Sequence, residues 1–268
     1  MELQLSDGGT LYYEVHGDRG APLVFLNGAM STTVAWAALV PLVSRHHRLV
    51  LVDFRDQGRS SRLPAGYPAT RHCADLIELF DHLGAAQVDL LGISYGGHVA
   101  MALARRHPRR LRRLVLASIT PRPSAHLLAA GGAWEAIAGH RDGAAFLAAC
   151  NPLVYSRRFH ERHGELLRAR QRAAADALDA AWFDAFLRIS ASARAFDHGD
   201  DLAAIAAPTL LLCGDEDALT PPDLVFAMAD RIPDCTALAI PGAGHGLMIE
   251  QPRAFAAAVL GFLALDPT

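Results

Sequence analysis

Ser94 lies at the centre of a pattern that can carry nucleophilic catalysis. Residues 92–96 read Gly-Ile-Ser-Tyr-Gly, with an apolar run before them and a helical pattern over 99–106 after them. In that setting, G-x-S-x-G places the serine on a strained strand-to-helix turn with its hydroxyl exposed. The small residues two before and two after the serine let the strand and the helix approach closely. We therefore predict that Ser94 is a nucleophile.

A serine hydroxyl is a poor nucleophile at neutral pH, so it needs a histidine within reach and a carboxylate that fixes the histidine tautomer. The chain has 13 histidines, but only His245 lies in a glycine-rich loop (residues 241–246, Pro-Gly-Ala-Gly-His-Gly) after the last predicted strand. We predict that His245 is the general base. His98, one turn into the helix that follows Ser94, is interpreted as a packed polar residue without a role.

The acid is expected after the preceding predicted strand, because the three residues follow the chain order serine, acid, histidine in this type of site. Three carboxylates are available there: Asp215, Glu216 and Asp217. Asp217 lies far enough past the strand to turn back toward His245, so we predict it as the acid. Asp215 is the alternative, although Asp215 and Glu216 are more typical of turn-forming or solvated residues.

The order of apolar runs predicts the scaffold for these loops. Short β-branched or leucine-rich runs alternate with helical patterns, which indicates a mostly parallel sheet covered by helices. The predicted strands cover 11–16, 23–27, 49–54, 88–93, 114–118, 209–213 and 237–240.

Residues 121–207 differ from the rest of the chain in composition and in hydrophobic spacing. They are rich in Ala and Arg and show no convincing strand. Helical spacing occurs over 133–138, 144–149, 166–178 and 182–196. We expect residues 121–207 to form a helical cap inserted into a core made of residues 1–120 and 208–268, with prolines at both boundaries.

Composition and charge argue against several classes of protein. The formal net charge is −3, and all 25 basic residues are arginines, scattered along the chain apart from a run over 105–113, so we expect no nucleic acid partner. No apolar run is long enough for a membrane span, and the N-terminus does not resemble a signal peptide, so we expect a cytoplasmic protein. His160 and His163 could face one side of a helix, but no third ligand stands out, and no metal is expected.

Several separated motifs, in order, resemble those of the α/β-hydrolase superfamily over nearly the whole chain. They are Phe-Leu-Asn-Gly-Ala-Met over 25–30, Asp-Phe-Arg-Asp-Gln-Gly-Arg-Ser over 53–60, the turn at Ser94, the acid loop over 214–222 and Gly-His-Gly over 244–246. The resemblance implies an α/β-hydrolase fold with an eight-stranded sheet. It also implies that the backbone N–H groups of Ala29 and Tyr95 form an oxyanion hole.

Two positions depart from the family pattern. Asn27 stands where the family commonly has histidine, which puts the hydrogen bonds behind the oxyanion hole in question, and Asp56 replaces a glycine of the family loop. Serine rather than aspartate at the nucleophile position argues against haloalkane dehalogenases and epoxide hydrolases. The first loop, over 26–33, is also similar to that of the synthase that joins 3-hydroxyacyl chains into the rhamnolipid precursor.

The expected activity is hydrolysis of carboxylic esters with short to medium acyl chains through an acyl-enzyme, without a cofactor. Met30, Trp182, Leu219 and Leu247 are predicted to bind the substrate, and other cap aromatics to extend the apolar walls. Enol-lactone hydrolysis and acyl transfer or thioester cleavage on 3-hydroxyacyl groups are alternatives, and a non-catalytic ligand receptor is a third class. The partner is a small ester or thioester; the sequence indicates no oligomeric state.

Overall fold

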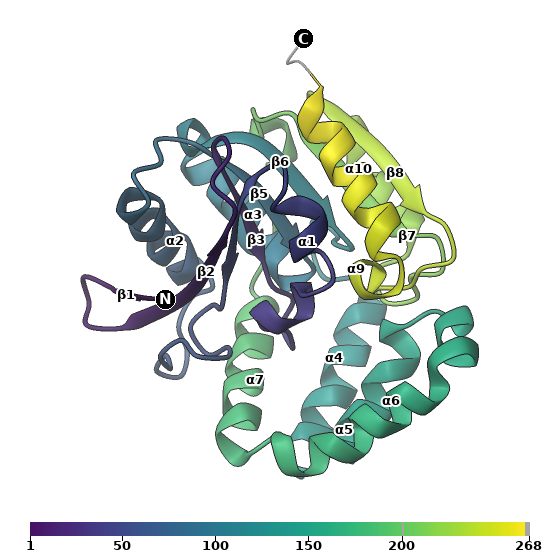
Figure 1. The fold of residues 1–268 in the computed structure, drawn as a ribbon. Helices are drawn as coiled ribbons and strands as arrows, with labels where there is room; N and C mark the ends of the chain where they lie inside the picture. The colour runs from purple at the N-terminus through teal and green to yellow at the C-terminus, as the bar shows by residue number, and fades with distance from the viewer. Residues whose placement is uncertain (200, 266–268) are drawn as a thin grey trace.

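The computed structural model, which describes residues 1–199 and 201–265, contains an eight-stranded mixed sheet (Figure 1). The strand order is β1-β2-β4-β3-β5-β6-β7-β8. β2 is antiparallel to both β1 and β4, and every pairing from β4 to β8 is parallel. The bounds are β1 (Glu2–Gln4), β2 (Thr10–His16), β3 (Pro22–Leu26), β4 (Arg48–Val52), β5 (Val88–Ile93), β6 (Leu111–Ala117), β7 (Thr209–Gly214) and β8 (Cys235–Ile240). The predicted eight-stranded, mostly parallel sheet is confirmed.

The central strands are continuous apolar runs because both of their faces are covered. Every residue of β3, β5 and β7 is buried, as expected for parallel strands between two helical layers. One face packs against α2 (Arg71–His82) and α3 (Tyr95–Arg106), and the other against α1 (Val40–Val43) and α10 (Pro252–Ala264). The remaining short elements are α8 (Pro222–Phe226), α9 (Leu247–Glu250), η1 (Thr33–Trp36), η2 (Pro108–Arg110), η3 (Leu202–Ala204) and η4 (Ala229–Arg231).

Between β6 and β7 the chain forms four helices, which we call the cap helices. They are α4 (Ala125–Ala138), α5 (Gly143–Val154), α6 (Arg157–Ala177) and α7 (Ala180–Ala193), and they lie together below the sheet in Figure 1. Each begins after a serine or aspartate whose side chain accepts a hydrogen bond from a backbone N–H in the first turn. Such N-caps satisfy amide groups that a helix cannot pair internally. The caps explain why α4 and α6 begin about eight residues earlier than apolar spacing predicted.

Aromatic rings join cap helices α5 and α7. Phe146 of α5 lies 4.9 Å from Phe186 and 5.8 Å from Phe183, both on α7, measured between ring centroids. Leu219, which follows β7, packs against the same apolar cluster. The cluster therefore connects the cap helices to the loop that carries the predicted acid. None of the described helices is long and apolar enough to span a membrane.

Candidate active site

Ser94 occupies the sharp turn between β5 and α3, and its backbone is strained. Its φ of 51° and ψ of −118° lie where residues with a side chain are rarely found. Gly92 and Gly96 permit this turn: a Cβ on Gly92 would lie 2.3 Å from the Gly96 carbonyl oxygen, and one on Gly96 would lie 2.5 Å from that of Leu26. Any larger residue at either position would push strand and helix apart. The predicted turn is thus built as the motif requires.

His245 and Asp217 come together from the loops after β8 and β7. His245 Nδ1 lies 3.0 Å from Asp217 Oδ2 and 3.3 Å from Oδ1, and both side chains are almost fully buried. A carboxylate in this position fixes the tautomer of the imidazole and leaves Nε2 as the basic nitrogen. Of the three carboxylates after β7, Asp217 is the one that reaches the histidine.

Asp217 is held as an anion by a set of donors. Burial alone would raise its pKa, but the charge and hydrogen bond of His245 and the donors of Thr220 outweigh burial, and the pKa lies below its usual value. Asp217 Oδ1 accepts hydrogen bonds from the Leu219 and Thr220 amides at 2.9 and 2.8 Å. The Thr220 hydroxyl donates to Oδ2 at 2.8 Å. Sequence reasoning missed Thr220, whose only signal was its position three residues after the acid.

Asp215, the alternative acid, has a structural task. Its Oδ1 accepts a hydrogen bond from the Gly242 amide at 2.6 Å, at the start of the loop that carries His245. Glu250 supports the same loop from its other side by accepting the Gly244 amide at 2.9 Å. Two carboxylates therefore fix the backbone on which His245 stands.

The predicted oxyanion donors lie beside Ser94. Ala29 and Tyr95 line the same cavity as Ser94, and a Cβ on neighbouring Gly28 would lie 3.7 Å from the Ser94 Cβ. Within residues 1–199 and 201–265, the N–H groups of Ala29 and Tyr95 donate no hydrogen bond to another protein group. The Tyr95 amide is also at the N-terminus of the 12-residue helix α3, where the helix dipole favours negative charge.

Asn27 anchors the loop that carries Ala29. Its amide nitrogen donates to the Val52 carbonyl at 2.7 Å and to Gln57 Oε1 at 3.2 Å, and its oxygen accepts the Trp36 indole N–H at 2.7 Å. Gln57 continues the network by donating to the Gly28 carbonyl at 2.8 Å. The asparagine thus satisfies its buried polar atoms and supports the loop that carries Ala29, at the position where the family commonly has histidine.

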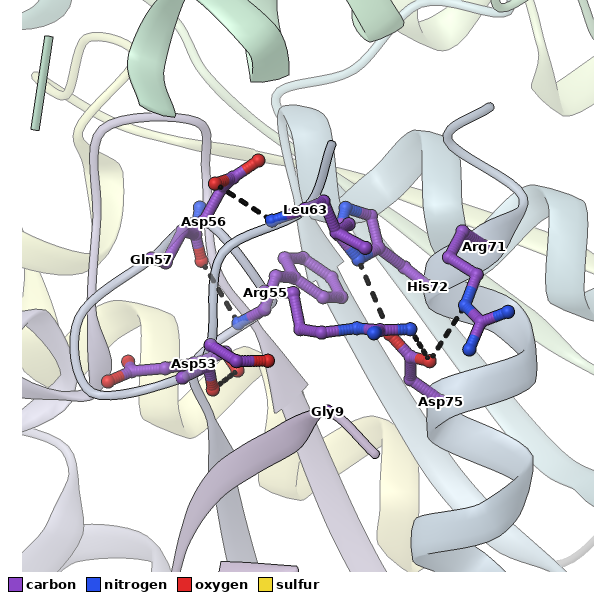
Figure 2. Close-up of polar contacts among 12 residues, drawn as sticks. Gly9, Asp53, Arg55, Asp56, Gln57, Leu63, Arg71, His72 and Asp75 are labelled. Atoms are coloured by element: carbon purple, nitrogen blue, oxygen red, sulfur yellow. Dashed lines mark hydrogen bonds and ion pairs between the residues drawn. The ribbon is translucent and has the colours of Figure 1, made fainter. Parts of the chain in front are cut away.

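Buried polar contacts also fix the loop over 53–60, as Figure 2 shows. Arg55 forms a two-point ion pair with Asp75 of α2, Nε–Oδ2 at 2.8 Å and Nη2–Oδ1 at 2.6 Å. His72 lies 4.0 Å from Asp75, but burial and the nearby Arg55 and Arg71 lower its pKa to about 3. The ring is therefore neutral at neutral pH, and this contact is not an ion pair.

Ser94 and His245 open onto a cavity of about 390 Å³. Of the predicted substrate-binding residues, Met30 and Leu219 line it. Leu247 instead is fully buried in the core between the sheet and α10, because its side chain fills the layer under the His245 loop. Trp182 lies outside this cavity and stacks on Phe186 at 5.7 Å between ring centroids, lining a smaller hollow near the loop over 53–60.

The cap helices contribute most of the remaining wall. The side chains of Trp134 and Phe186 line the cavity, whereas Phe146 and Phe183 are buried inside the cap cluster. Sequence reasoning gave no role in the site to several polar residues of the wall, which lie on helices or directly after them rather than in motif loops. These residues are His98, Asn151, Tyr155, Arg170, Ser190 and Arg194.

Comparison with known proteins agrees with this architecture. RutD of Variovorax paradoxus, a carbamate hydrolase by name, is 30% identical over 262 residues, which are 95% of this chain and 96% of RutD. MGS-M2, an α/β hydrolase enzyme from a Medee basin deep-sea metagenome library, has a TM-score of 0.95 and 31% identity over 100% of this chain and 98% of its own. A thermophilic esterase from Thermogutta terrifontis has a TM-score of 0.85 and 27% identity over 98% of this chain and 97% of its own.

A family model described as the alpha/beta hydrolase family matches residues 23–258. The match spans every strand from β5 to β8 and all of the loops that carry the site. The chain belongs to the α/β hydrolase family.

Proposed function

We propose that this hydrolase cleaves carboxylic esters through a Ser94 acyl-enzyme. The observation that carries the proposal is the Asp217–His245 pair, 3.0 Å apart, whose histidine lines one apolar cavity together with a serine held in a strained turn. Ser94 Oγ attacks the carbonyl carbon and passes its proton to His245 Nε2. The Ala29 and Tyr95 amides stabilise the oxyanion that forms.

Collapse of this intermediate breaks the bond to the alcohol, which leaves with the proton from His245. Water then attacks the acyl-enzyme while His245 takes a proton from it, and the acid departs as His245 returns the proton to Ser94. Asp217 remains an anion throughout and stabilises the imidazolium, which is consistent with its lowered pKa.

The cavity supports short to medium acyl groups as substrates. A volume of about 390 Å³ is within the range of pockets that enclose small ligands. Much of the wall is apolar, including Met30, Ile119, Leu127, Trp134 and Leu219. We further propose that residues 121–207 act as a cap over a core made of residues 1–120 and 208–268.

A carbamate is the second candidate substrate, because the chain is similar to RutD along most of its length. A carbamate would follow the same steps, with a carbamoyl group on Ser94. The apolar walls favour an ester with a hydrocarbon chain, since a small polar carbamate would leave most of this surface uncovered.

The test is hydrolysis of p-nitrophenyl esters from acetate to long-chain acyl, with a carbamate in the same series. Native protein should release nitrophenol with a preference for one acyl length. Ser94→Ala and His245→Ala should each lower kcat by about 10⁴-fold or more. His126→Ala, an exposed position on α4, is the matched control and should keep full activity. Full activity in Ser94→Ala would overturn the proposal.

A further inference from the structure

His98 lies on the cavity wall one helical turn beyond the nucleophile. It is the fourth residue of α3, its amide donates to the Ser94 carbonyl at 3.2 Å, and its side chain lines the same cavity as Ser94. Four residues of α-helix correspond to about 6 Å along the axis. The imidazole therefore lies beyond the reacting atoms, where it can contact another part of the substrate.

The imidazole is buried and incompletely bonded. Only 4% of the residue is exposed, its ring stacks on Phe196 at 4.7 Å between centroids, and Nδ1 has no hydrogen-bond partner within the described ranges. Buried polar atoms in native proteins are nearly always paired. Because His98 also lines the cavity, its ring has bonding capacity that a ligand or water could use.

The protonation state of the His98 imidazole determines which groups it can bind. Burial and the neighbouring His198 lower the pKa of His98 to about 3, so the ring is neutral at working pH. A neutral imidazole has one nitrogen that donates and one that accepts a hydrogen bond. Without a positive charge it suits an uncharged oxygen, such as a hydroxyl or a keto group, better than a carboxylate.

The other polar side chains that line the cavity from α3, from α7 and from the residue after α7 are already paired. The Tyr95 hydroxyl bonds to Ser192 at 2.9 Å. Ser190 donates to Glu135 at 2.6 Å, and Arg194 pairs with the same carboxylate at 3.0 Å. His98 is thus the polar side chain on this wall with unused bonding capacity.

The alcohol oxygen of the ester must lie near His245, because it receives its proton from that residue. The cavity wall formed by α3 is therefore available to the acyl chain. We propose that His98 binds a hydroxyl or keto oxygen on the acyl chain and gives the enzyme a preference for oxygenated acyl esters. This role rests on the proposed ester hydrolysis and makes His98 a specificity residue.

The experiment compares kcat/KM for p-nitrophenyl hexanoate with the 3-hydroxy and 5-oxo hexanoate esters. Native enzyme should prefer at least one oxygenated ester by about tenfold, the size expected for one buried hydrogen bond. His98→Phe keeps an aromatic ring against Phe196 and should lower kcat/KM for the oxygenated ester about tenfold more than for plain hexanoate, which abolishes the preference. His98→Asn, which restores a polar group, should recover part of it.

The matched control is His198→Phe. His198 is also a buried histidine next to Phe196, but it does not line the cavity, so this variant should keep the native preference. A native enzyme without preference, or a preference that survives in His98→Phe, would overturn the role of His98. Hydrolysis of plain hexanoate that depends on Ser94 would remain in either case, so this failure is distinct from failure of the proposed activity.

Discussion

Asp56 and Arg188 form a two-point ion pair that joins the loop over 53–60 to cap helix α7. Arg188 Nη2 lies 2.6 Å from Asp56 Oδ1, and Nε lies 3.1 Å from Oδ2. Asp56 adopts a φ of 71° and stands where the family loop has a glycine. Its neighbour Gln57 bonds to the Gly28 carbonyl, so one short loop contacts both the cap and the oxyanion loop.

Loss of Arg188 should destabilise the protein strongly. The Asp56 side chain is fully buried, so Arg188→Gln would leave a carboxylate without its partner at a cost of about 3 kcal/mol. The free energy of unfolding in urea measures this cost. Asp56→Gly added to Arg188→Gln should restore much of the stability, because it removes the unpaired charge and glycine accepts the positive φ.

The control for this ion pair is Arg141→Gln. Arg141 pairs with Asp184 at 2.9 Å, but both side chains are about half exposed, so the loss should be below about 1 kcal/mol. Equal losses for Arg141→Gln and Arg188→Gln would contradict the importance of burial.

Asn27→Ala should lower kcat with little change in KM. The variant removes the acceptor of the Trp36 indole N–H and a donor to Gln57 Oε1, and the loop that carries the Ala29 amide loses its anchor. Because the oxyanion forms only in the transition state, the expected loss is in kcat, by about 10- to 100-fold. Steady-state kinetics on the preferred ester measures the effect, and a change confined to KM would argue against it.

Thr220→Val should weaken the His245–Asp217 pair while keeping the shape of the side chain. Without the hydroxyl donor, the pKa of Asp217 should rise toward its ordinary value, and His245 loses part of its orientation. We expect kcat to fall by about tenfold, as for loss of one hydrogen bond to a charged group. Thr220→Ser, which keeps the hydroxyl, should retain most of the activity, and equal losses in both variants would point to packing instead.

Stability should fall as the pH is lowered through the range of the buried histidines. Burial lowers the pKa of His72 and of His98 to about 3 and that of His198 to about 4, whereas an unfolded histidine titrates near 6.5. Below about pH 6.5 the unfolded chain binds protons that the folded chain does not, so each histidine removes about 1.4 kcal/mol per pH unit. Above about pH 6.5 each buried histidine is neutral in both states, and no stability is lost through it.

Urea unfolding between about pH 7 and about pH 5 measures this slope. His72→Phe places an apolar ring among Phe54, Tyr67 and Tyr95 and should reduce the slope by about one proton. An unchanged slope in His72→Phe would show that His72 is protonated in the folded state.

The sequence was sufficient for the sheet and for the loops of the site, because both depend on local signals. Apolar runs marked the central strands, and glycines marked the turns that carry Ser94 and His245. The antiparallel β1 was missed, since a three-residue edge strand has too little pattern. Leu247 and Trp182 were placed by closeness in sequence or by type, which does not determine the direction in which a side chain points.

Contacts between segments far apart in the chain could not be predicted from the sequence. Asp56 was recognised as a departure from the family loop, but its partner Arg188 lies 132 residues away on a mostly apolar helix. The role of Asn27 likewise depends on Trp36 and Gln57, which no local pattern connects to it. His98 was interpreted as packing because its unpaired nitrogen is visible only in the folded structure.

The central claim is that Ser94 forms the acyl-enzyme. Mass spectrometry of the protein after reaction with a fluorophosphonate, and after acid quench during turnover of the preferred ester, tests this most directly. We predict one covalent group per chain on the peptide that contains Ser94, much slower labelling in His245→Ala and none in Ser94→Ala. A covalent group on another residue, or ester turnover at the native rate in Ser94→Ala, would contradict the mechanism.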